Sequence, residues 1–125
     1  MKAYSSDEYR LFSMAKRKAR KKIVGMLPSC WDYKIQTSTR YFFNNLKKTA
    51  HIHWILKFNF QYETDSKWTY GNVTWYPCST DFSIDDHLLE ISTRSNDLSK
   101  INEDFDQIKK CAELLTELLD PENYR

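Results

Sequence analysis

The spacing of apolar residues changes twice along the chain and divides it into a helical segment, a run of strands and a second helical segment. In the first segment apolar side chains recur every three or four residues, the period of one helix face: Phe12, Ala15, Ala19, Ile23 and Met26. The pattern predicts a helix from about Asp7 to Met26. A Ser5–Glu8 capping box would open this helix, and Gly25 with Pro28 would end it.

From Trp31 onward the period becomes two, which is typical of strands with one buried face. Aromatic and β-branched residues alternate with polar ones over 31–43 and again over 52–62, around a turn at Asn44–Asn45 and Lys47–Lys48. A third strand follows a turn at 64–66 and ends at Pro77; its aromatic phase changes near Gly71, where we expect a β-bulge. A short fourth strand is expected over 89–93.

The last segment returns to helical spacing for six turns, with this apolar stripe: Leu98, Ile101, Phe105, Ile108, Ala112, Leu115 and Leu119. Asn96 or Asp97 can cap its start, and Pro121 follows its end. The order of elements predicts one α+β domain over residues 1–125. In this fold both helices cover the aromatic face of an antiparallel meander of three to four strands, and the other face is polar.

Charge is divided unequally between the two ends of the chain. Residues 1–80 have 14 Lys and Arg against 5 Asp and Glu, whereas residues 81–125 have 5 against 12. Six of the seven residues from 16 to 22 are cationic. Like charges three and four positions apart on a helix repel each other, so such a cluster is costly for the helix unless an anionic partner neutralises it. So dense a cluster also attracts polyanions over long range. The alternative is internal neutralisation by the acidic C-terminal helix.

Composition narrows the remaining classes of function. With two glycines, the chain cannot build the glycine-rich loops that hold nucleotide phosphates or activate a serine nucleophile, and we predict neither enzymatic activity nor a cofactor. The sequence has no transmembrane segment and no secretory signal, and a membrane is not expected as a partner. Three widely spaced cysteines are typical of reduced thiols, which indicates the cytoplasm.

Two small constellations could carry chemistry, and we predict a site in neither. His51 and His53 would point to one side of a strand, but no spacing rule supplies a third metal ligand from Cys78, His87 or the aspartates 85 and 86. The same aspartates, with His87 and Cys78, offer a thiol and a base without an oxyanion hole. A polar loop with an idle cysteine explains them equally well.

The polar face of the first two strands extends the cationic surface. It is expected to carry Lys34, Gln36, Ser38, Arg40, His51, His53, Lys57, Asn59 and Gln61. These side chains could reach phosphates, or they could form an ordinary solvated face. The alternation places the aromatic residues in the core, which disfavours binding by base stacking.

The leading hypothesis is a small non-enzymatic protein that binds nucleic acid, or a nucleic-acid-binding complex, through the basic helix. The residues expected to bind are Lys16, Arg17, Lys18, Arg20, Lys21 and Lys22, supported by Lys34, Arg40, Lys47 and Lys48. The alternative is an inhibitor or adaptor of the kind found among phage and mobile-element accessory proteins. Its acidic C-terminal helix would imitate nucleic acid through Glu103, Asp104, Asp106, Glu113 and Glu117. The opposite charges also permit a homodimer.

Overall fold

The computed structural model describes residues 3–44, 47–64, 67–77, 87–93 and 99–124. A two-residue strand, β1 (Tyr4–Ser5), and a 3-10 turn, η1 (Ser6–Glu8), precede helix α1 (Tyr9–Ile23). Four longer strands follow: β2 (Trp31–Asn44), β3 (Lys47–Thr64), β4 (Lys67–Pro77) and β5 (His87–Thr93). Helix α2 (Ser99–Leu119) and a 3-10 turn, η2 (Pro121–Asn123), end the described chain. The predicted α+β order of helix, antiparallel strands and helix is confirmed.

The long strands pair with their neighbours in sequence order, and every pairing is antiparallel. Strand β1, which the sequence did not predict, pairs with β3 at His51 and Ile52. Because β2 pairs with these same β3 residues, β1 and β4 both occupy the other edge of β3. Strand β2 therefore forms one outer edge of the described sheet.

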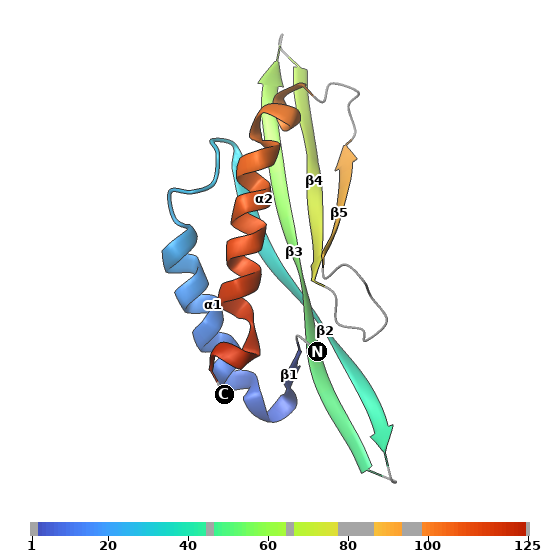
Figure 1. The fold of residues 1–125 in the computed structure, drawn as a ribbon. Helices are drawn as coiled ribbons and strands as arrows, with labels where there is room; N and C mark the ends of the chain where they lie inside the picture. Colours follow the sequence, from blue (N-terminus) through green and yellow to red (C-terminus); the bar gives the residue numbers. More distant parts are fainter. Residues whose placement is uncertain (1–2, 45–46, 65–66, 78–86, 94–98, 125) are drawn as a thin grey trace.

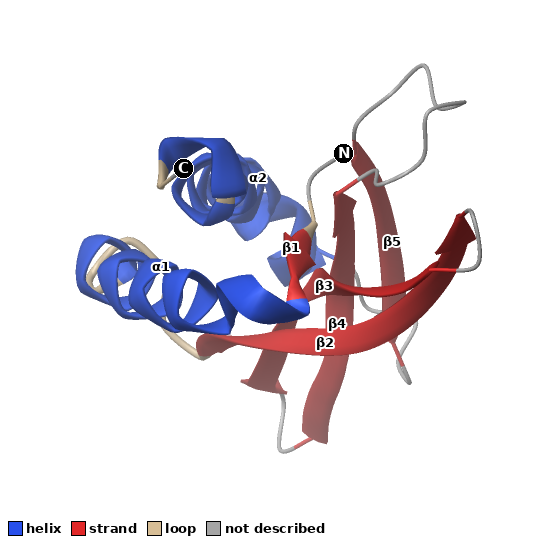
Figure 2. Ribbon diagram, turned by 90° about the horizontal axis from the view of Figure 1, so that it is seen from below, coloured by secondary structure: helices blue, strands red, loops and turns tan. Residues whose placement is uncertain are grey.

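Both helices cover one face of this sheet, as Figure 2 shows from below. The covered face of β3 carries the even-numbered apolar residues from Trp54 to Tyr62, which are all buried. The apolar stripe of α1 belongs to the same core as this face, and Ala15 and Ala19 are fully buried in that core. The capping interaction at the start of α1 is confirmed, since the Ser5 backbone N–H donates to Glu8 Oε1 at 2.9 Å.

The two helices run antiparallel, and α2 fixes the turn that follows α1 (Figure 1). The side chains of Gln107 and Cys111 both donate to the backbone oxygen of Met26, at 2.9 and 3.7 Å. At the C-terminal end of α2, the Tyr4 hydroxyl donates to the backbone oxygen of Leu119. The middle and the C-terminal end of α2 are thus tied to the N-terminal part of the chain.

A buried polar network joins α2 to the sheet. The Trp31 indole N–H donates to the Tyr62 hydroxyl and to Asp104 Oδ2, the latter at 3.1 Å, and the Tyr62 hydroxyl donates to the same Oδ2 at 2.7 Å. Burial, together with the hydrogen bond to Asp104, raises the pKa of Tyr62. Asp104 was expected on the outer face of the C-terminal helix, and this expectation is wrong because two aromatic donors hold its carboxylate against the sheet.

The expected β-bulge at Gly71 is also wrong. Strands β3 and β4 pair without interruption from the Thr64–Lys67 pair next to the turn to the Leu56–Trp75 pair. Val73 and Trp75 therefore share the covered face, while Tyr70 lies on the opposite face with 42% of its surface exposed. The change of aromatic phase reflects residues on two faces of one regular strand.

The sheet is much longer than the helices that cover it. Helix α1 has 15 residues and spans about 22 Å, whereas the 18 residues of β3 span about 60 Å. One end of the β2–β3 hairpin consequently projects beyond both helices (Figure 1). We call residues 37–44 and 47–53 the hairpin arm. Thr39, Tyr41 and Phe43 lie on its inner face, where alternation predicted burial, but all three are exposed because no helix reaches them.

The polar network predicts that Asp104→Ala destabilises the fold by about 1–3 kcal/mol, since it removes the acceptor of two partly buried donors. The measurement is the midpoint and slope of urea unfolding. Asp106→Ala is the matched control, because Asp106 is exposed on the same helix and its removal should change stability by less than about 0.5 kcal/mol. Equal midpoints for the two variants would contradict the structural role of Asp104.

Candidate functional site

The six cations of α1 point in different directions around the helix. Lys16, Arg17 and Arg20 line a cavity between α1 and β2. The Lys18 ammonium lies on another side, 5.2 Å from the centre of the Tyr124 ring. Lys21 and Lys22 are exposed to solvent. The sequence thus predicted one binding surface, and the structure brings half of that cluster together.

No carboxylate of the described chain lies within ion-pair distance of these six cations. Glu103, Asp106, Glu113 and Glu117 of α2 are exposed, and so are Lys109 and Lys110 on the same helix. Leu11 of α1 and Leu114 of α2 are partly buried against the common core. Internal neutralisation by direct ion pairs is therefore not seen in the described residues.

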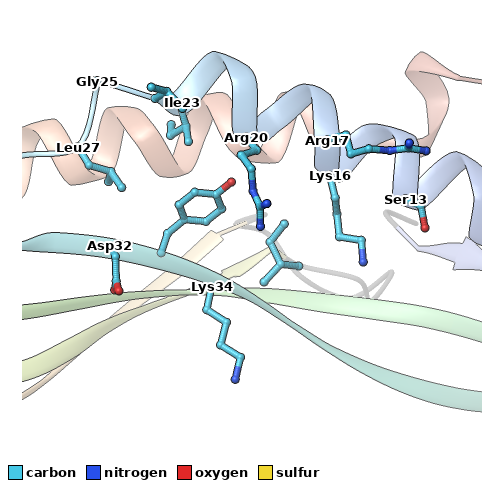
Figure 3. A pocket seen from close by; sticks show the side chains of 12 residues that line it. Ser13, Lys16, Arg17, Arg20, Ile23, Gly25, Leu27, Asp32 and Lys34 are labelled. Atoms are coloured by element: carbon cyan, nitrogen blue, oxygen red, sulfur yellow. The ribbon is translucent and has the colours of Figure 1, made fainter.

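The cavity beside α1 has a volume of about 740 Å³, within the range of ligand pockets in proteins. Its apolar wall consists of Ile23, Leu27, Tyr33 and Ile35. In Figure 3 the side chains of Lys16 and Arg20 extend from α1 toward β2. Asp32 and Lys34 also border the cavity, but their side chains point to the far side of the strand (Figure 3). The cavity therefore combines an apolar floor with a cationic rim.

The outer edge of β2 has backbone groups that pair with no strand of the described chain. The Gln61 N–H donates to the Cys30 oxygen at 3.2 Å, so residues 30 and 61 form a hydrogen-bonded pair of the antiparallel ladder. Even-numbered residues of β2 therefore point their peptide groups toward β3, and the N–H and C=O groups of Tyr33 and Ile35 point to the outer edge.

Tyr33 links the apolar and charged parts of the cavity. Its burial raises the pKa of the phenol, while the charge of Arg20 and a hydrogen bond with that guanidinium act in the opposite direction. Arg20 and Tyr33 thus lie close together in the lining of the cavity. A planar guanidinium suits bidentate contact with phosphate or carboxylate oxygens.

The supporting cations expected on the strands lie along the β2–β3 hairpin, and of these four residues only Lys34 borders the cavity. The β2–β3 register places Lys34 and Arg40 on the uncovered face of the sheet. Lys48 lies on the covered side of the hairpin arm, where its ammonium is 4.2 Å from the centre of the Tyr41 ring. Lys47 and Lys48 are both exposed. The structure therefore has two cationic regions, one at α1 and one along the hairpin.

The uncovered face contains the predicted polar residues with one correction. His53 was expected to be exposed, but only 7% of its surface is accessible, and neither ring nitrogen has a hydrogen-bond partner within the described residues. The Phe42 ring lies against both histidines, 4.9 Å from His51 and 6.4 Å from His53 between ring centres. No group of three metal-ligating side chains occurs in the described chain, and Cys78 with the aspartates 85 and 86 lies outside it.

Sequence reasoning missed the exposed aromatic residues of the hairpin arm. Tyr41 is 56% exposed, Phe42 40% and Phe43 75%. Alternation alone assigned Tyr41 and Phe43 to the core. The length of the predicted elements could have indicated this exposure. The strands have 14 and 18 residues and the helices 15 and 21, but a helix rises only about half as far per residue as a strand, so the strands extend beyond the helices.

Comparison with known proteins gives no match, whether to a family model, to a curated protein or to a solved structure. Neither helix of the described chain has the length and apolarity needed to cross a bilayer. The function is therefore inferred from the cavity, the cations and the exposed rings alone.

The burial of His53 predicts a pH dependence of folding. Burial, followed by the nearby charges of Arg40 and His51, lowers its pKa below the ordinary value of 6.5, so the folded state binds fewer protons than the unfolded state. This contribution to the free energy of unfolding should be complete above pH 6.5 and should decrease as the pH falls below it.

Chemical unfolding from about pH 7.5 to about pH 5 measures this effect. His53→Leu should lose less stability over this range than the wild type, because no proton must be excluded from a buried imidazole. Parallel pH profiles for the two proteins would show that His53 titrates equally in the folded and unfolded chain.

Proposed function

We propose that this protein is a non-enzymatic binding protein for nucleic acid, and that phosphates bind in the cavity between α1 and β2. The single observation that carries the proposal is that Lys16, Arg17 and Arg20 line one cavity while no described carboxylate pairs with them. A cationic cluster that the described part of the chain leaves without ion pairs attracts polyanions over long range, and phosphate contacts with release of counterions supply the affinity.

The form of the cavity supports a phosphate backbone over an isolated small anion. Its cations are spread over more than one helical turn, and the open edge of β2 runs beside them with outward N–H groups at Tyr33 and Ile35. Several donors along a line match the repeated phosphates of a strand better than they match a single charge. The free thiols of Cys30 and Cys111 support the proposal that it acts in the cytoplasm.

We expect the charge reversals Arg17→Glu and Arg20→Glu together to weaken oligonucleotide binding about tenfold or more, because a charge-assisted hydrogen bond contributes about 1.5–3 kcal/mol. Fluorescence anisotropy across a salt series measures this change. For a single strand, the slope of log affinity against log salt should fall by about 0.7 for each phosphate that the variant no longer neutralises.

Two further variants serve as controls for total charge. Lys18→Glu with Lys21→Glu changes the charge of α1 equally but outside the cavity, and Lys109→Glu with Lys110→Glu does so on α2. The cavity variant should lose the most affinity and the α2 variant the least. Equal decreases in all three would mean that binding follows net charge alone, and the cavity would then not be the site.

The acidic face of α2 supports a second proposal, an inhibitor or adaptor that binds the basic cleft of a partner protein. Asp106, Glu113 and Glu117 are exposed, and no ion pair of theirs occurs in the described chain. Asp104 is already bonded to Trp31 and Tyr62, and Lys109 and Lys110 dilute the patch, so this second proposal is the weaker one. Under it, Glu113→Lys with Glu117→Lys abolishes capture of the partner and leaves oligonucleotide binding unchanged.

A further inference from the structure

We propose that the hairpin arm is a second contact for the nucleic acid, and that Tyr41 and Phe43 stack on unpaired bases of a single strand. This inference rests on the proposed function, because it names the form of nucleic acid that the same protein binds. Two aromatic side chains on the covered face of the sheet are exposed: Phe43 is 75% exposed and Tyr41 56%. Burial in the core does not account for aromatic residues at these positions.

The spacing of the two rings suits one base. Tyr41 and Phe43 are two residues apart on one face of β2, so their positions along the strand differ by about 6.8 Å. Successive bases in a nucleic-acid strand are about 3.4 Å apart, and one base fits between rings held at twice that distance. Stacking of this kind tolerates any sequence, since every base has a π-face.

The charge of the hairpin favours a polyanion over a second copy of this chain. From Asp32 to Glu63 the sequence contains five lysines and arginines and no carboxylate between those two residues. Two such hairpins would repel each other. On the arm itself, the Lys48 ammonium lies over the Tyr41 ring, which adds a cation next to the exposed rings.

The two rings lie on the same face of β2 as the cavity wall. Tyr41 and Phe43 share the covered face of the strand with Ile35, which lines the cavity. A flexible strand can follow β2 for about 20 Å, from Tyr41 to Ile35, and so reach both contacts.

The experiment compares binding of fluorescent oligothymidylate, oligouridylate and a duplex of equal length to the full chain. Tyr41→Ala with Phe43→Ala should weaken binding of the single strands by about fivefold to 150-fold, the range for removal of one base stack, and should leave duplex affinity nearly unchanged. Because stacking is not ionic, the salt slope should remain that of the wild type.

Three further variants distinguish stacking from general apolar contact. Tyr41→Trp with Phe43→Trp should retain single-strand affinity, whereas Tyr41→Leu with Phe43→Leu should reduce it although the arm remains apolar. Tyr70→Ala is the matched control. It removes an aromatic residue of β4 that is 42% exposed and lies on the uncovered face of the sheet, opposite to the face of Tyr41 and Phe43. Its affinity should equal that of the wild type.

Several results would overturn the inference. If the wild type binds with the expected salt dependence but Tyr41→Ala with Phe43→Ala binds equally well, the arm is not a contact and the cavity proposal stands. If the alanine variant instead loses binding to vesicles of anionic lipid, or loses self-association in sedimentation, the rings serve a membrane or a second copy. If the wild type binds no oligonucleotide, both proposals fail together.

Discussion

The structure depends on a difference in rise between its two kinds of element. A strand advances about 3.3 Å per residue and a helix 1.5 Å, so helices of comparable residue number cover only about half the length of these strands. The covered half forms the core, in which Ala15 and Ala19 of α1 are fully buried. The uncovered half becomes the hairpin arm. Both candidate contacts for a polyanion, the cavity at α1 and the arm, follow from this division.

Helix α2 fixes the geometry of the cavity without lining it. Its hydrogen bonds to Met26 hold the turn after α1, and the bonds of Asp104 to Trp31 and Tyr62 hold the start of β2. The cavity lies between these two restrained elements. Removing the acid from this network would therefore disturb the placement of β2 as well as the stability of the fold.

Much of the fold could be predicted from the sequence, because the two hydrophobic periods are local properties. The stripe from Phe12 to Ile23 and the alternation on both sides of residue 45 specify a helix and two strands, whatever lies around them. A local pattern misleads where two different structures produce it. A bulge and a regular strand with aromatic residues on both faces give the same phase change at Gly71, and only the register with β3 distinguishes them.

The basic character of α1 and the absence of carboxylates between the ends of the hairpin follow directly from the amino-acid sequence, since composition and helical period suffice to establish them. The orientation of the acidic residues of α2 does not follow from it. They are exposed because the apolar residues of both helices belong to one core, which is a property of the packed chain. The exposure of Tyr41 and Phe43 is of the same kind. Burial depends on which elements reach a residue, and no local pattern contains that information.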